Sequence, residues 1–130
     1  MATIRAYTSL EQSNKLLELG LNPKSADLEY KCVGFTMHAN RPTDNFKYKV
    51  MLKEQSIPHG QEYNIPCWSL ATLLEILDYP QLSKDKLGSG KEGWMVSVYP
   101  NDCRYDSCWH DNPIDACVDM IEKLNELNLL

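Results

Sequence analysis

The chain has no long hydrophobic run and no excess of basic residues. Its richest apolar stretch, residues 70–77, is interrupted by Thr72 and Glu75 and is too short to cross a bilayer. Residues 1–5 lack the apolar core of a secretion signal. The formal net charge of -5 at pH 7 excludes the basic footprint that most nucleic-acid-binding proteins carry. We therefore expect an acidic, cytoplasmic protein that binds neither membranes nor nucleic acids.

The chain also lacks internal repeats, low-complexity tracts and any stretch with the composition of an interdomain linker. Its 130 residues, of which 43% are hydrophobic and 24% charged, are typical of one soluble domain, so we expect a single compact domain over residues 1–130. The five cysteines cannot all pair within one chain. Without an export signal, they are expected to remain reduced thiols.

Three segments have the features of helices, and the first covers residues 8–19. Its candidate capping boxes are Thr8 with Glu11 and Ser9 with Gln12. Gly20 ends this helix. Leu21 is expected to fold back onto the last turn, as in a Schellman motif.

The second helix is expected from near Pro66 to Asp78, and its middle is apolar on nearly every side, which predicts a buried element. The third helix is expected within residues 111–130. Asn112 is suited to its N-cap and Pro113 to its first position. Its apolar stripe consists of Ile114, Cys117, Val118, Ile121 and Leu124.

Three β-prone runs predict strands at residues 28–37, 46–53 and 94–99. The first two form an antiparallel hairpin, and residues 100–110 form either a loop or a return strand. The helices and strands do not alternate as they do in parallel βαβ units. We therefore expect an α+β fold, a two-layer sandwich with a mainly antiparallel sheet of three to four strands and three helices packed largely on one face.

Cys67 is the first candidate for chemistry. If a helix begins near Pro66, its N-terminus lowers the pKa of the Cys67 thiol and favours a nucleophile. Gln61 would then assist as an oxyanion donor, and His110 or His59 would act as the base.

The segment Gln61-Glu62-Tyr63-Asn64-Ile65-Pro66-Cys67-Trp68 resembles the papain-like peptidases, in which a glutamine precedes Cys-Trp at a helix start. It departs from that family because the glycine-rich turn before the cysteine is absent and His110 directly precedes a helix. In the alternative interpretation, Cys67 and Trp68 fill space at the mouth of a buried helix.

A second candidate site lies in residues 102–111. Cys103, Cys108 and His110, with Cys117 further along, offer the thiolate and imidazole ligands of a tetrahedral zinc site. Structural zinc sites usually contain closely spaced cysteine pairs, which are absent here, and Cys117 lies on the apolar stripe. The alternative is a packed loop beside the last helix, and we assign no metal or cofactor.

The remaining candidates have simpler interpretations. His38 ends a predicted strand and His59 lies in a Pro-His-Gly turn, where an exposed histidine needs no special role. The lysines of the second predicted strand, Lys47, Lys49 and Lys53, are interpreted as a solvated face and not as a nucleic-acid contact. With 3 Trp and 7 Tyr, some aromatic side chains are expected on the surface, where they favour protein contacts.

Three stretches, residues 1–10 (MATIRAYTSL), 66–70 (PCWSL) and 111–117 (DNPIDAC), carry a resemblance across the chain. They resemble a family of small proteins of gut anaerobic bacteria and their phages or mobile elements, a family with no assigned activity. The resemblance implies a cytoplasmic accessory protein of phage origin.

Because no catalytic constellation is complete, the first functional hypothesis is a non-enzymatic interaction module that binds an unknown protein partner or a second copy of itself. The alternatives are a cysteine hydrolase that uses Cys67 and a module stabilised by zinc at Cys103, Cys108 and His110.

Overall fold

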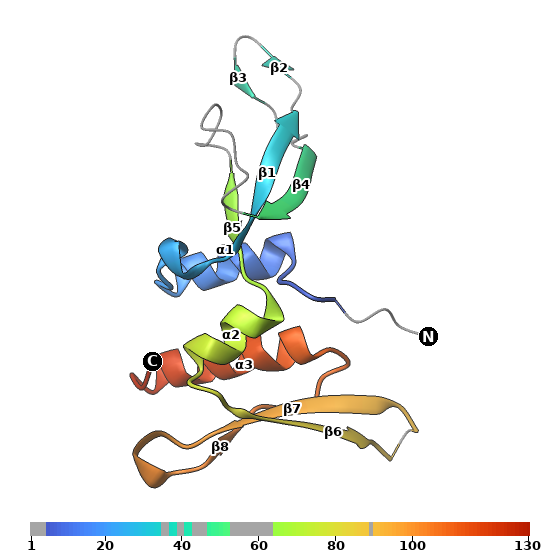
Figure 1. Ribbon diagram of the computed structural model, residues 1–130, viewed down its shortest axis with the longest axis vertical. Helices are drawn as coiled ribbons and strands as arrows, with labels where there is room; N and C mark the ends of the chain where they lie inside the picture. Colours follow the sequence, from blue (N-terminus) through green and yellow to red (C-terminus); the bar gives the residue numbers. More distant parts are fainter. Residues whose placement is uncertain (1–4, 35–36, 39–40, 43–46, 53–63, 89) are drawn as a thin grey trace.

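The computed structural model describes residues 5–34, 37–38, 41–42, 47–52, 64–88 and 90–130. Three α-helices lie between two antiparallel sheets of three strands each (Figure 1). The helices are α1 (Leu10–Glu18), α2 (Leu70–Ile76) and α3 (Pro113–Glu126). The first sheet has the order β4 (Lys47–Leu52), β1 (Leu28–Gly34), β5 (Ile65–Cys67), and the second has the order β6 (Gln81–Lys86), β7 (Glu92–Val98), β8 (Tyr105–Asp106). The smaller elements within the described residues are a ribbon of β2 (Met37–His38) and β3 (Arg41–Pro42) and the 3₁₀ helices Pro23–Ser25 and Pro100–Asp102.

The α+β class, the antiparallel pairing and the three helices confirm the fold predicted from the sequence. Apart from the β2–β3 ribbon, the described strands are divided between two three-stranded sheets on opposite sides of the helices (Figure 1). Within the described part of the chain, no helix is both long and apolar enough to span a membrane.

The core lies where α2 and α3 pack on each other and on β7. Leu73 of α2, Val96 of β7 and Ile121 of α3 are all fully buried. The other residues of the predicted apolar stripe of α3 are also buried, and the most exposed of them, Val118, is 6% exposed. Trp68, just before α2, is also fully buried, and its indole N–H donates to Ser25 Oγ at 2.9 Å. A buried tryptophan needs such an acceptor, so this bond orients the largest side chain of the core.

Of the two capping boxes predicted for α1, the one at Ser9 and Gln12 is confirmed, and the helix begins at Leu10. The Ser9 hydroxyl accepts the Gln12 N–H at 3.1 Å, and the Gln12 side chain accepts the Ser9 N–H at 2.9 Å, which completes a capping box. Gly20 follows with a φ of +92°, and the Leu21 N–H donates to the Leu16 carbonyl at 3.1 Å. This is the Schellman ending expected from Gly20 and Leu21.

The second helix begins later than the sequence predicts, and the expectation of a start at Pro66 is wrong. Ser69 is the N-cap, and Ile65–Cys67 form strand β5, in which Cys67 lies opposite Leu28. β5 is an edge strand, where the missing N–H of a proline is tolerated. Pro66, which the sequence predicts as the first residue of a helix, lies in a strand because residues 65–67 pair with β1.

Strand β6 is absent from the elements expected from the sequence. Its last three residues, Lys84, Asp85 and Lys86, are charged and exposed, so it lacks the apolar alternation of a predicted strand. It is nevertheless paired with β7 along its whole length. Within residues 100–110, β8 is a return strand of two residues, Tyr105 and Asp106, set in a longer loop.

Candidate functional site

Cys67 does not have the environment expected of a helix-activated nucleophile. It lies in strand β5, and its side chain is 0% exposed. The thiol donates to the Thr8 carbonyl oxygen at 3.5 Å. Burial raises the pKa of the Cys67 thiol above its ordinary value, although the Thr8 hydroxyl, which donates to Cys67 Sγ at 3.7 Å, partly offsets this effect. The expectation of a lowered pKa is therefore wrong, because the helix N-terminus lies two residues further along the chain.

The other residues proposed to act with Cys67 are placed as follows. His110 pairs through its backbone with Trp94 of β7, whereas Cys67 pairs with Leu28 in the opposite sheet. Gln61 and His59 lie outside the described residues.

The predicted zinc ligands occupy different environments. Cys117 is fully buried in the α3 stripe, and burial raises the pKa of its thiol to about 12. Cys103 and Cys108 are both exposed, and His110 is half-buried. Among the residues that the structure describes, no three His, Cys, Asp or Glu side chains are grouped as a metal site requires.

The remaining candidates from the sequence are surface or edge positions. The strand predicted over residues 28–37 ends at Gly34, and His38 ends a separate short strand, β2. Lys49 of β4 is exposed and lies opposite Lys31 of β1, which fits a solvated face. Lys53 lies outside the described part of the chain.

A groove of about 880 Å³ lies between α1 and α3. We call it the polar groove; the charged residues along its walls include Glu11, Lys15 and Glu18 of α1 and Asp115, Asp119 and Glu122 of α3. Carboxylates outnumber cations along its walls, so it has a negative charge overall.

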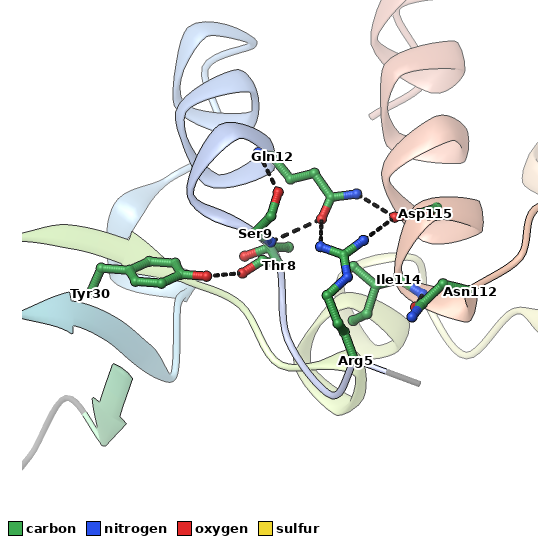
Figure 2. A network of polar contacts seen from close by, with 8 residues as sticks. All are labelled: Arg5, Thr8, Ser9, Gln12, Tyr30, Asn112, Ile114 and Asp115. Atoms are coloured by element: carbon green, nitrogen blue, oxygen red, sulfur yellow. Dashed lines mark hydrogen bonds and ion pairs between the residues drawn. The ribbon is translucent and has the colours of Figure 1, made fainter. Parts of the chain in front are cut away.

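A network of polar contacts, to which the groove-lining residues Arg5, Gln12 and Asp115 belong, joins the N-terminal segment, α1 and α3 (Figure 2). Arg5 donates to Asp115 Oδ1 at 2.6 Å and to Gln12 Oε1 at 3.1 Å. The Gln12 amide N–H also donates to Asp115 Oδ1 at 2.6 Å, while its oxygen accepts the Ser9 N–H. Gln12 therefore serves both as a helix cap and as a bridge to α3. These satisfied bonds give the network a structural role.

Asp119, four residues after Asp115 on α3, also lines the polar groove and bonds to the loop that precedes α3. Its Oδ2 accepts the Cys108 backbone N–H at 2.9 Å and pairs with His110 Nε2 at 2.9 Å. Burial acts to raise the pKa of the Asp119 carboxyl, but the hydrogen bonds from His110 and Cys108 outweigh burial and hold the pKa below its ordinary value. Asp119 therefore binds the backbone of Cys108 and the ring of His110 at the groove.

A second groove, of about 390 Å³, lies near the C-terminal ends of α2 and α3. We call it the apolar groove; its lining includes Leu77, Tyr79, Val98, Tyr99, Leu124 and Leu130. Tyr79 is 79% exposed, Tyr99 53% and Leu130 52%. Large apolar side chains are thus gathered around a hollow that is open to solvent.

Comparison with protein-family models, with curated proteins and with solved structures finds no match to this chain. The candidate sites therefore depend on the geometry of the chain itself.

Sequence reasoning missed Asp119 and the apolar groove. Asp119 lies on the polar side of the predicted last helix, where a carboxylate is ordinary, and no sequence spacing links it to His110. The apolar groove joins residues from the ends of α2, β7 and α3. The number of tyrosines predicted that some would be exposed in a contact surface, but only the fold shows which of them lie close together.

Proposed function

We propose that this protein is a non-enzymatic interaction module that binds a protein partner through the apolar groove. The observation that carries the proposal is the exposure of Tyr79, Tyr99 and Leu130 around one hollow. Aromatic side chains are enriched in protein interfaces, where they fill pockets of the partner and exclude water. An accessory role in the cytoplasm, of phage or mobile-element origin, is the part of the proposal that rests on the sequence resemblance.

The backbone at Tyr79 supports a role outside folding. The positive φ of Asp78 belongs to the ending of α2, but Tyr79, the next residue, also has a positive φ, 54°, in the left-handed region that favours glycine. Such a conformation costs of order 1–3 kcal/mol at a non-glycine residue. The Tyr79 side chain, at 79% exposed, recovers little of this cost through burial. The strain instead presents an aromatic ring to solvent at the rim of the apolar groove.

The lining of the groove indicates the chemistry of the partner. Among the described residues that line it, Asp78 alone has a charged side chain, although the chain as a whole carries a net charge of -5. We therefore expect the partner to insert an apolar or aromatic segment of its surface, with neutral or basic residues beside it.

The test is selection of peptides from a random phage-displayed library on the immobilised protein. We expect the selected peptides to contain apolar and aromatic residues and to lose binding by tenfold or more, a loss of about 1.4 kcal/mol or more, in the Tyr79→Ser, Tyr99→Ser variant. Trp109→Ser is the matched control, because Trp109 is 39% exposed and does not line the apolar groove.

Peptides that bind the double variant as tightly as the unaltered chain would contradict the proposal. Sedimentation of the unaltered protein tests whether a second copy of the chain occupies the groove. A dimer that dissociates in the Tyr79→Ser, Tyr99→Ser variant would show that a second copy, and not a different partner, covers this surface.

A further inference from the structure

Strand β6 has an outer edge that faces solvent. It is the end strand in the order β6-β7-β8, so β7 is its one neighbour among the strands that the structure describes. Gln81 and the last three residues of β6 are exposed. An edge strand presents backbone N–H and C=O groups to which an extended chain can bind.

The hydrogen bonds of β7 show which backbone groups of β6 point to this edge. In an antiparallel pair, residues that bond to the neighbouring strand alternate with residues that point away from it. Trp94 of β7 exchanges both of its backbone hydrogen bonds with His110, at 2.7 and 2.8 Å. The carbonyl of Val96 accepts the Ser107 N–H at 2.9 Å. The backbone groups of Trp94 and Val96 therefore point away from β6.

The residues of β6 opposite Trp94 and Val96 are Lys84 and Leu82. Because the two β7 residues bond on their other side, these pairs are the non-hydrogen-bonded ones of the β6–β7 ladder. The backbone N–H and C=O of Leu82 and Lys84 therefore point to the outer edge of β6. Within the described part of the chain, no hydrogen bond occupies these outward groups.

The hairpin between β6 and β7 independently gives the same alternation. The Leu87 N–H donates to the Lys91 carbonyl at 2.8 Å. The positions of β6 that bond to β7 are therefore every second residue before Leu87, namely Asp85 and Ser83. Lys84 lies between these two, which places its backbone groups on the outer edge.

The outer edge is partly closed at the hairpin end and open at the groove end. At the hairpin end, the Lys86 N–H donates to Asp85 Oδ1 at 2.8 Å. At the other end, Gln81 directly follows Pro80, which lines the apolar groove, and accepts the hydroxyl proton of Tyr99 at 3.1 Å. Pro80 has no N–H, so a strand paired with β6 leaves the ladder there. The open part of the edge therefore leads into the apolar groove.

We infer that the partner binds as an extended segment that adds an antiparallel strand to the outer edge of β6, with its following residues in the apolar groove. The inference rests on the proposed function and names the form in which the partner binds. The segment exchanges hydrogen bonds with Leu82 and Lys84, each of which offers one donor and one acceptor. Antiparallel pairing continues the pattern of the second sheet.

The charges of β6 indicate the composition of this segment. The Lys84 ammonium pairs with Glu92 at 3.0 Å and lies 5.1 Å from the centre of the Trp94 ring. Lys86 is exposed, and no carboxylate of the described residues forms an ion pair with it. We expect the segment to place an acidic residue opposite Lys86 and an apolar residue opposite Leu82. The aromatic or apolar residues that fill the groove then follow.

The experiment adds a synthetic copy of the peptide selected from the phage-displayed library to the unaltered protein and follows amide hydrogen exchange by NMR. We expect saturating peptide to slow exchange at Leu82 and Lys84 at least about tenfold, and by a larger factor than at Ser83 and Asp85, whose N–H groups already bond to β7. Binding that depends on Tyr79 but leaves Leu82 and Lys84 unprotected would overturn this inference and leave the proposed function standing. Failure to select any peptide would overturn both.

The Lys84→Pro variant removes one outward N–H and keeps the bonds between β6 and β7, because Lys84 does not bond to β7. We expect its affinity for the peptide to fall at least about fivefold, the effect of one lost hydrogen bond. Lys84→Ala is the matched control, since it removes the same side chain but keeps the N–H. Equal affinities of the two variants would overturn the inference.

The exchange measurement on the unaltered chain decides the question if Lys84→Pro fails to fold. The same measurement tests for a second copy of the chain on this edge. Protection of Leu82 and Lys84 that rises with protein concentration in the absence of peptide would assign the edge to a second copy and would overturn the inference.

Discussion

The Asp119 carboxylate connects helix α3 to the loop between β8 and α3. It is the acceptor for two groups of that loop, the Cys108 N–H and the His110 ring, and it comes from the first half of α3. Hydrogen bonds to a charged acceptor are stronger than those between neutral groups. The ionised state of this one carboxyl therefore connects loop geometry to the stability of the folded chain.

The Asp119→Asn substitution is expected to cost stability at neutral pH and to cost less in acid. The pKa of Asp119 in the folded protein lies below its ordinary value of 3.8. The carboxylate therefore contributes stability that is complete above the ordinary value and is lost as the pH falls through the folded one. Urea denaturation of both proteins at several pH values between about 6 and 3 measures the difference. A difference in unfolding free energy that does not change with pH would contradict this account.

At the same scale, the sequence singled out Cys108 and His110 as candidates but not Asp119, the carboxylate that bonds to both. Cys108 and His110 were candidates because thiol and imidazole side chains are rare and reactive. The role of Asp119 was not predictable, because a carboxylate on the polar side of a helix is ordinary and its partner is chosen by the path of the loop. Cys67 was misjudged for a related reason, since its environment depends on whether residues 65–67 find a strand to pair with.

Among the elements, the helix caps were predicted correctly from nearby residues, whereas strands that depend on a distant partner were not. The capping box at Ser9 and the N-cap at Asn112 were predicted because each involves groups within a few residues of one another. Strands β5 and β6 were missed because their partners, β1 and β7, supply the reason for their extended conformation. Propensity is a weak guide where a neighbouring strand determines the backbone.

Each of the three helices ends with a residue in the left-handed conformation. Substitutions at two of these positions, Asp78 and Gly20, are expected to change stability in opposite directions. The residue after each C-cap is Gly20, Asp78 or Asn128, and each has a positive φ. Asp78→Gly is expected to raise the unfolding free energy by about 0.5–1 kcal/mol, because glycine adopts this backbone without strain. Gly20→Ala is expected to lower it by about 1 kcal/mol for the same reason, since a Cβ at Gly20 meets no neighbouring atom within 4 Å.

Urea denaturation of the two variants beside the unaltered chain measures both effects. A loss of stability in Asp78→Gly would mean that the aspartate side chain contributes more than its backbone strain costs. The Gly20→Ala variant shows whether the method resolves a change of this size.

In the whole molecule, burial is distributed unequally between the two sheets. The second sheet contributes Val96 and Val98 to the core, and both pack with buried residues of α2 and α3. Of the first sheet, β4 contributes no buried side chain among its described residues, and Leu52 at its end is 50% exposed. The first sheet extends away from the helices (Figure 1). We therefore expect the molecule to open in parts.

Native-state hydrogen exchange is expected to show this order of stability. Amides of α3 and β7 should exchange only through global unfolding, whereas those of β4 should exchange through a smaller opening with a lower free energy, because little buried apolar area is lost when β4 detaches. Leu73→Ala, which removes a fully buried side chain, should lower the exchange free energy of α3 and β7 by about 2–5 kcal/mol. The β4 amides should keep their value as long as global unfolding remains the costlier event. Equal exchange free energies for β4 and α3 in the unaltered chain, falling together in the variant, would show instead that both sheets belong to one cooperative unit.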